Sequence, residues 1–525
     1  MECACIRYTD LPHATRLFTD LAYHFDRVRT FYPYSPHDGA SFREAAARIS
    51  FPPERRAAMA AALREQNGDS AELDLLAQPG TVAVVTGQQV GLFSGPAYTI
   101  YKALTAAKLA RALSAQGIPA VPVFWLATED HDFAEVNHCW VFDSSHHPVK
   151  LEVDGSQAPG QPVGGIRMPA PPTAEMAAAL QGFPFGQEIA GLVQEAYAPG
   201  ANLGQAFATL LRKLLPNYGL LVVDPMQPAM RELAAGPIRS ALEVAPELTS
   251  EVLDRNQALA AAGYHAQVHV EAHTAFVFLL ENNRRVALRR NGREYLANGR
   301  RFSTEELMER AATLSPNALL RPVVQDAIFP TVAYVGGPAE LAYLAQSEVI
   351  YKAILGRMPV AMPRSGFTML DWRTRKLIKR YRLSLQDVFR GSEFLRERMA
   401  EILVPEPLAR TLDETETEIA RSLERLYGEL ERFDPTLAAA LATSRRKITY
   451  QLEKIGAKVG RESLSRHEQA GSDAEFLEAL IYPHKHLQER FYSIIPLLAK
   501  HGPDLVDRIY ENVRLDCPDH QLLMV

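Results

Sequence analysis

The sequence predicts an α/β protein that has a parallel-sheet core and a long helical region toward its C-terminus. Residues 81–138 have the order strand, glycine-rich turn, helix and strand, which defines one βαβ unit. Residues 319–370 repeat this order, with a glycine–proline turn between the strand and the helix. Beyond residue 407, apolar residues recur at alternating spacings of three and four, the pattern of helices that pair along an apolar seam.

The composition is that of an ordinary globular protein. The chain has 525 residues, a length at which two or three domains are expected. With 47% hydrophobic residues, 22% charged residues and a net charge of -6, it favours neither nucleic acid nor an anionic membrane as a partner. No apolar run approaches the ~18 residues of a membrane span, and the N-terminus lacks the apolar core of a signal peptide. Four scattered cysteines are typical of a reducing compartment, so we expect a cytoplasmic protein.

The domain organisation follows from changes of pattern along the chain. We expect residues 1–380 to form the core, with a helical lead-in over residues 1–80, and residues 381–525 to form a helical coiled-coil domain with further C-terminal helices. Residues from about 265 to 302 alternate in polarity between Asn-Asn and Asn-Gly turn signals, which predicts an antiparallel insertion. The long apolar seam predicts a homodimer through the coiled coil. A hairpin within one chain is the alternative.

The first βαβ unit contains the strongest candidate for a binding loop. Gly87, Gly91 and Gly95 follow its first strand, and a helix begins near Pro96. Loops after the strands of a right-handed crossover share one edge of the sheet, where ligands bind. Glycines allow close backbone approach, and the free N–H groups of a helix start suit an anion. The spacing fits neither common nucleotide-binding glycine motif. We predict a ligand-binding loop, and a tight structural turn is the alternative.

A cluster of titratable residues follows the second strand of this unit. Glu129, Asp130, His131 and Asp132 offer acids, a base near neutral pKa and ligands for Mg²⁺. One alternative is that the cluster caps the next helix. Another is a zinc site made of His131, His138 and Cys139 with Asp130 or Asp132. The spacing matches no zinc pattern, so no metal site is assigned.

Three stretches of the chain closely resemble the BshC family, the cysteine ligase family of the last step of bacillithiol synthesis. They are TGQQVGLFSGPAYTIYK (86–102), PVFWLATEDHDFAEVNH (122–138) and RPVVQDAIFPTVAYVGGPAELAY (321–343). The resemblance runs in order through the chain and includes the late helical region. It implies a Rossmann-like core with inserted connecting segments, a coiled-coil domain that dimerises, and a pocket for an adenine nucleotide.

The resemblance also implies a reaction, in which cysteine is joined through its carboxyl group to the amine of glucosaminyl malate. Because amide formation from a free carboxylate is unfavourable in water, the carboxylate needs activation as an adenylate or an acyl phosphate. ATP is the expected driver, ATP or ADP the expected bound nucleotide, and Mg²⁺ a further candidate. A nucleotidylyl transferase-like enzyme acting on a small molecule and a non-catalytic, nucleotide-binding dimeric scaffold are the alternatives.

Roles are assigned to these positions on physical grounds. We predict that His131 is the general base for the attacking amine and that Asp130 or Asp132 orients it. Glu129 is expected to hold a cation or the ammonium group of cysteine. The predicted substrate- and nucleotide-binding residues are Gly87, Gln88, Gln89, Gly91, Gly95, Tyr98, Lys102, Gln325, Tyr334 and Glu340.

Overall fold

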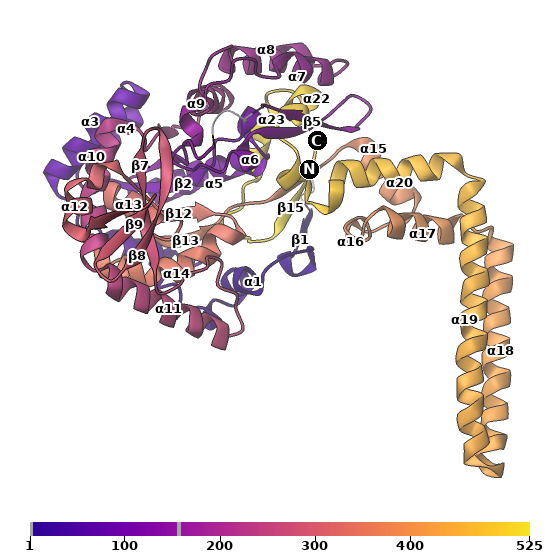
Figure 1. Ribbon diagram of the computed structural model, residues 1–525. Coiled ribbons are helices and arrows are strands. Elements are labelled where there is room, and N and C mark those ends of the chain that lie inside the picture. The colour runs from indigo at the N-terminus through magenta and orange to yellow at the C-terminus, as the bar shows by residue number, and fades with distance from the viewer. Residues whose placement is uncertain (1–3, 155–158) are drawn as a thin grey trace. The chain divides into compact units, whose positions relative to one another are not determined.

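The computed structural model describes residues 4–154 and 159–525, and the chain divides into two compact units (Figure 1). The core unit holds the chain up to Thr368 together with Glu489–Leu523, and the helical unit holds Met369–Gln488. The predicted boundary at residue 380 therefore lies inside the helical unit. The last part of the predicted helical domain belongs to the core unit instead.

A five-stranded sheet runs through the core unit, and its strand pairs are all parallel. The strands lie in the order β13 (Val360–Pro363), β12 (Thr331–Gly336), β2 (Val82–Gln88), β3 (Ala120–Leu126) and β6 (Leu221–Val223). Nearly every residue of these strands is buried. Their continuous apolar runs are typical of a parallel sheet that is covered on both faces. The predicted α/β class is confirmed.

Two crossover units build this sheet in the order that the sequence predicts. The first consists of β2, α5 (Tyr98–Ala115) and β3, and the second of β12, α14 (Pro338–Leu355) and β13. β2 and β12 are neighbours, so the chain moves from β2 toward one edge of the sheet and from β12 toward the opposite edge. Where a sheet changes direction in this way, a crevice forms at the carboxyl ends of the strands. Ligand binding is expected there.

An antiparallel sheet lies between the two crossover units in the sequence. Its strands have the order β10 (Arg300–Ser303), β9 (Glu294–Ala297), β8 (Arg284–Asn291), β7 (Thr274–Glu281) and β11 (Leu314–Pro316). Asn282 and Asn283 turn the chain between β7 and β8 with φ angles of 52° and 59°. Tight hairpins need positive φ at both central residues, and asparagine tolerates it. The sheet extends beyond the predicted range of about 265–302, because β11 follows the helix at Thr304–Glu309 and pairs with β7.

Helices and one hairpin complete the core unit. The hairpin pairs β4 (His138–Phe142) with β5 (Pro148–Glu152). The first helices are α1 (Arg16–Tyr23), α2 (Gly39–Ala47), α3 (Pro53–Asn67), α4 (Ala71–Ala77), α6 (Phe133–Val136), α7 (Thr173–Ala179), α8 (Gly186–Ala196) and α9 (Leu203–Leu214). The later ones are α10 (Pro228–Glu243), α11 (Ala245–Ala261), α12 (Thr304–Glu309), α13 (Arg321–Ile328), α21 (Gln488–Phe491), α22 (Ile495–His501) and α23 (Leu505–Asn512).

The C-terminal segment belongs to the core unit through contacts that no local pattern reveals. Glu489 forms an ion pair with Arg364 at 2.6 Å, and the two side chains are only 1% and 4% exposed. The last strand, β15 (His520–Met524), pairs antiparallel with the first strand, β1 (Ala4–Ile6). Both contacts join residues that are far apart in the sequence. A pattern of helices along the sequence does not reveal such long-range contacts.

The helical unit contains the predicted pair of long helices. α18 (Glu406–Phe433) and α19 (Pro435–Ser465) meet at Asp434, run side by side in Figure 1, and are linked by an ion pair between Glu424 and Arg445 at 2.7 Å. The shorter helices are α15 (Trp372–Arg380), α16 (Leu385–Val388), α17 (Ser392–Leu403) and α20 (Glu468–Ile481). Across residues 4–154 and 159–525, no helix has the length and apolar character needed to cross a membrane.

The helical pair leaves apolar side chains on its surface. α18 has no buried residue at all. The exposed large apolar residues of the pair are Leu408, Leu426, Phe433, Leu437, Ile448, Tyr450 and Ile455. The hairpin within one chain therefore covers only part of the apolar seam, and the uncovered part is available to a second copy.

We expect the wild-type chain to be a dimer and the Leu426→Glu/Phe433→Glu variant to be a monomer. These side chains are 47% and 81% exposed, so charging them should disrupt a contact between chains without unfolding the hairpin. Light scattering and circular dichroism measure mass and helix content. Ser422→Glu/Thr443→Glu adds the same charge at exposed polar positions and should leave the dimer intact. A dimer that survives the apolar pair of changes would exclude this surface as the main contact.

Candidate active site

A cavity of about 690 Å³ lies at the carboxyl ends of β2, β3 and β12. Its volume is in the range of small-molecule sites, roughly 300–1,000 Å³. The crossover units contribute the residues at the strand ends and helix starts, while the antiparallel insertion and the C-terminal segment contribute the remaining walls. The cavity occupies the place where the sheet changes direction, as expected for this topology.

The cavity is lined by charges of both signs. Its basic residues are Arg285, Arg321, Arg364 and Arg490, and its acidic residues are Glu129, Asp130, Glu135 and Glu340. Guanidinium groups bind carboxylates and phosphates through paired hydrogen bonds, and carboxylates accept hydrogen bonds from an ammonium group. The site therefore suits a substrate or a pair of substrates that carry both kinds of group.

Glu129, just beyond β3, is held by an arginine from α10. Its side chain is 5% exposed and accepts a hydrogen bond from Arg231. Arg231 also donates to the carbonyls of Ala312 and Leu314, next to the antiparallel sheet. Burial raises the pKa of Glu129, and the positive charge of Arg231 opposes this effect. Glu129 thus lines the cavity as a positioned carboxyl group.

Asp130 is held in its ionised form by several donors. Gln89 donates its side-chain amide at 2.8 Å, the backbone N–H of His131 donates at 2.7 Å, and the Arg285 guanidinium lies 3.6 Å away. Burial alone would raise the pKa of Asp130, but these hydrogen bonds and the positive charge of Arg285 hold it below its ordinary value. Asp130 fixes the position of Gln89 in the cavity wall.

His131 does not line the cavity, and its basic nitrogen faces a guanidinium group. Nδ1 lies 3.3 Å from Arg285 and 3.7 Å from Asp130. Because a guanidinium can only donate, Nδ1 must accept, and the proton of a neutral ring then resides on Nε2. The lone pair that a general base would use is therefore engaged. The carboxylate near His131 is that of Asp130. Asp132 is exposed and makes no capping hydrogen bond at the start of α6.

Arg285 is positioned by the antiparallel sheet. It donates to the hydroxyl of Ser315 at 3.1 Å and to the carbonyl of Pro316 at 2.8 Å, and its charged group lies 3.9 Å from the centre of the Phe278 ring. Burial lowers the pKa of its guanidinium, although this group stays charged at physiological pH. The insertion thus places one fixed cation in the cavity wall.

The glycine loop is part of the protein interior. A Cβ on Gly91 would meet Gly95 at 2.9 Å, and one on Gly87 would meet the carbonyl of Trp125 at 2.8 Å. The backbone N–H of Ala97, at the start of α5, donates to the carbonyl of Tyr492 at 2.7 Å. None of the three glycines lines the cavity. The three glycines therefore serve close packing, whereas Gln88 and Gln89 of the same loop line the cavity.

We expect Gly91→Ala to destabilise the fold by about 1–3 kcal/mol, because the added methyl group overlaps the backbone of Gly95. Thermal unfolding measures the loss as a lower Tm. Gly236→Ala is the matched control, since a Cβ there meets nothing within 4 Å. A Gly91→Ala variant that keeps its Tm but loses affinity for a substrate would show instead that Gly91 contacts a ligand.

Lys102 and Glu340 form a pair beneath the cavity. Lys102 is fully buried, and its ammonium lies 2.6 Å from Glu340 and donates to Gln88 at 2.9 Å and to the carbonyl of Gly87. Burial raises the pKa of Glu340, but Lys102 and the backbone N–H of Gly337 hold it below its ordinary value. Lys102 therefore positions Gln88 and Glu340, which line the cavity, and does not line it itself.

Arg321 stands at the start of α13 in a network of polar side chains. It donates to Gln325 and to the Tyr343 hydroxyl, both at 3.0 Å. The Tyr334 hydroxyl donates to Glu340 at 2.7 Å. Gln325 and Tyr334 are fully buried and do not line the cavity, whereas Arg321, Tyr343 and Glu340 do. The two predicted residues act as supports for the residues that face a ligand.

Two arginines flank Tyr98, the first residue of α5. The guanidinium of Arg364 lies 5.2 Å from the ring centre and that of Arg490 lies 5.8 Å from it. Arg364 is neutralised by two hydrogen bonds to Glu489, at 2.6 and 3.0 Å. Arg490 is exposed, and within the described chain its charge faces no acidic partner at ion-pair distance. The segment after the helical unit thus supplies a free cation to the cavity.

The structure brings six predicted residues into the cavity wall: Gln88, Gln89, Tyr98, Glu129, Asp130 and Glu340. The predicted residues outside the wall are Gly87, Gly91, Gly95, Lys102, His131, Asp132, Gln325 and Tyr334. Sequence reasoning missed the four arginines. A signal exists for Arg364, which directly follows β13 and so reaches the same sheet edge, and for Arg321, which begins a stretch that resembles the BshC family.

The zinc alternative finds no support in the geometry of its residues. Cys139 is buried in β4, and burial raises the pKa of its thiol to about 12, which disfavours the thiolate that a metal needs. Ligand atoms of His131, His138 and Cys139 do not converge within metal-binding distance in the part of the chain that the structure describes.

The fold and the cavity define a Rossmann-like α/β protein with a mixed-charge small-molecule site and an appended helical pair. Comparison with known proteins narrows this class. Residues 1–365 match the family described as "Bacillithiol biosynthesis BshC, N-terminal Rossmann-like domain", and residues 367–525 match "Bacillithiol biosynthesis BshC, C-terminal coiled-coil domain". The chain belongs to the BshC family.

The similarity to known proteins extends over the whole chain. A protein of Solibacter usitatus (strain Ellin6076), named "Putative cysteine ligase BshC", is 58% identical over 525 residues that cover 100% of both chains. A protein of Koribacter versatilis (strain Ellin345) with the same name is 33% identical, with 99% of each chain covered. One of Salinibacter ruber (strain DSM 13855 / M31), also so named, is 31% identical and covers 97% of this chain and 96% of its own.

Proposed function

We propose that the chain is a cysteine ligase that joins the carboxyl group of cysteine to the amine of glucosaminyl malate, with ATP as the source of activation. The observation that carries this proposal is the mixed-charge cavity at the sheet edge, in a chain whose relatives are named as cysteine ligases. Both substrates carry an amine and at least one carboxylate, which matches a wall of guanidinium and carboxylate groups.

The distribution of charge in the cavity suggests how the substrates are oriented. Among the residues that the structure describes, no acidic side chain lies at ion-pair distance from Arg321 or Arg490, so these two arginines are the best partners for the two malate carboxylates. Glu129 and Glu135 lie on the wall formed by the end of β3 and α6. The ammonium group of cysteine fits this acidic side. The two ends of the reacting pair would then meet near Gln88 and Gln89.

The residues of the cavity also fit the phosphates of ATP. Guanidinium groups suit phosphate as well as carboxylate. The N–H groups at the start of α5 are less suitable, because the first of them already donates to Tyr492. A nucleotide in this cavity would be held by side chains, and Mg²⁺ would enter with it.

Incubation of the protein with ATP, cysteine and glucosaminyl malate tests the proposal. Mass spectrometry should detect bacillithiol, and AMP or ADP identifies activation as an adenylate or as an acyl phosphate. Omission of each substrate in turn should abolish the product. A nucleotidylated small molecule without an amide product would indicate a nucleotidylyl transferase. Binding of ATP without turnover under any of these conditions would indicate a non-catalytic, nucleotide-binding scaffold.

A further inference from the structure

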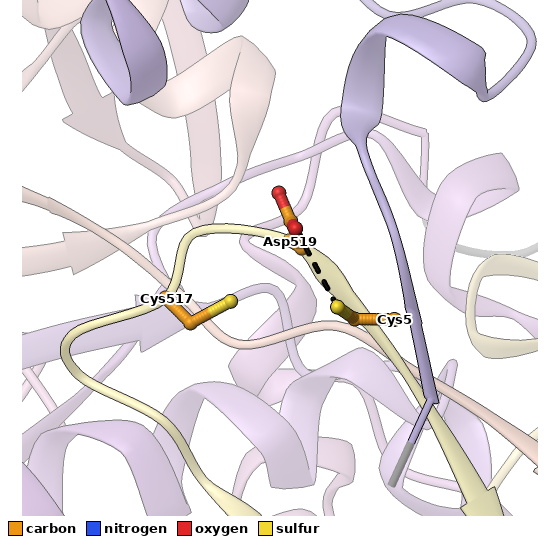
Figure 2. A group of neighbouring side chains, drawn as sticks. All are labelled: Cys5, Cys517 and Asp519. Atoms are coloured by element: carbon orange, nitrogen blue, oxygen red, sulfur yellow. Dashed lines mark hydrogen bonds between the residues drawn. The ribbon is translucent and has the colours of Figure 1, made fainter.

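Two cysteines and an aspartate from opposite ends of the chain meet in the core unit. Cys5 lies in β1, and Cys517 and Asp519 lie just before β15, the strand with which β1 pairs. The two sulfur atoms and a carboxylate oxygen of Asp519 all lie within 4.8 Å of one another. In Figure 2 the thiols of Cys5 and Cys517 face each other, and a dashed line marks the hydrogen bond from Cys5 to Asp519. In the part of the chain that the structure describes, no other histidine, cysteine, aspartate or glutamate residues form such a group of three.

The carboxylate of this group is held in a fixed orientation. Tyr23 donates its hydroxyl to one oxygen of Asp519 at 2.7 Å and accepts the backbone N–H of Tyr8 at 2.9 Å. The other carboxylate oxygen accepts the thiol of Cys5 at 3.5 Å. Hydrogen bonds of this kind, from a neighbouring residue to a ligating carboxylate, are typical of metal sites because they fix the direction of the ligand.

Without a cation, the Cys5 thiol stays protonated and donates to Asp519. Burial, the carboxylate of Asp519 and the neighbouring thiol of Cys517 all raise the pKa of Cys5. A divalent ion would reverse this effect, since it binds thiolates and carboxylates together. Cys5 is exposed and Cys517 and Asp519 are half-buried, so an ion can reach all three from solvent.

We propose that Cys5, Cys517 and Asp519 form a zinc site that ties the first strand of the chain to its last. Two thiolates and one carboxylate oxygen provide three ligands of a tetrahedral Zn²⁺ site, and water completes it. Each thiol releases its proton to solvent when the ion binds, and the three anionic ligands and the ion together carry one negative charge. None of the three residues lines the cavity, so the site is structural and independent of the ligase proposal.

Metal titration of the full-length, reduced and chelator-treated protein tests this site. Competition with a chromophoric chelator should give one tightly bound Zn²⁺ per chain, and Co²⁺ should give the absorption bands of a tetrahedral thiolate complex. Cys5→Ser and Cys517→Ser should each lower zinc affinity more than 100-fold. Tyr23→Phe, which leaves every ligand in place, should lower it by about 10- to 100-fold. Cys139→Ala removes a buried thiol outside the group and should have no effect.

A second measurement needs no variant. Zn²⁺ should protect Cys5 and Cys517 from alkylation in the wild-type protein and should raise its Tm. Absence of stoichiometric zinc in the reduced protein, or binding that survives Cys517→Ser, would overturn the proposal. A Cys5–Cys517 disulfide that forms in air in a protein that takes up no zinc after reduction would also overturn it and assign the pair to redox chemistry.

Discussion

Replacement of Arg321 by glutamine is expected to lower kcat/KM for glucosaminyl malate by about 10²- to 10³-fold, mainly through KM. Arg321 faces the cavity while Gln325 and Tyr343 hold its guanidinium from behind, so its geometry is set before a ligand binds. Loss of a charged hydrogen-bonding partner in a partly buried site costs about 3–4 kcal/mol, and 1.4 kcal/mol corresponds to a factor of ten. Steady-state kinetics with varied glucosaminyl malate measure the effect.

Matched variants separate binding from folding. Arg321→Lys keeps the charge but loses the paired geometry, so it should recover only part of the activity. Arg300→Gln removes an exposed arginine outside the cavity, which pairs with Glu281 at 2.8 Å, and should change neither kcat nor KM. An Arg321→Gln variant with wild-type KM and an unchanged Tm would show that Arg321 does not bind this substrate.

Replacement of Arg364 by methionine is expected to destabilise the core unit by about 3–5 kcal/mol. The change leaves the carboxylate of Glu489, which is only 1% exposed, without its cation. Removal of one partner of a buried ion pair is costly because the other charge stays desolvated. Urea denaturation followed by fluorescence measures the loss. The Arg364→Met/Glu489→Gln double variant should be more stable than Arg364→Met alone, since the amide carries no charge and still accepts the backbone N–H of Phe367.

The pH dependence of this variant has a definite sign. In the wild type, Arg364 holds the pKa of Glu489 below its ordinary value despite burial, so the pair stabilises the fold above the ordinary carboxyl pKa and this contribution is lost as pH falls through the lower, folded value. Without Arg364, burial raises the pKa of Glu489, and protonation then stabilises the fold as pH falls. The difference in stability between the two proteins should therefore shrink from pH 8 to pH 5. A constant difference would contradict the ion-pair explanation.

The sequence by itself determined the class of fold and six residues of the cavity wall. Continuous apolar runs such as Val82–Val85 identify buried parallel strands, because both faces of such strands contact helices. Polar residues at the ends of these strands or just beyond them, such as Gln88 and Glu129, must then lie at one edge of the sheet. These inferences depend on periodicity and on the handedness of βαβ units, both of which are local properties of the chain. The same is true of the long helices of the helical unit.

Only the tertiary structure decided which charges meet in the cavity and which glycines lie outside it. Arg285 comes from an inserted sheet and Arg490 from the segment that follows the helical unit, and no spacing in the sequence connects them to Gln88. Gly91 follows the strand as a binding glycine would, yet close contact with Gly95 and burial of the loop give it a packing role. Cys5 and Cys517 become neighbours only when β15 pairs with β1. In each case long-range contacts, rather than local pattern, set the environment that determines the chemistry of the residue.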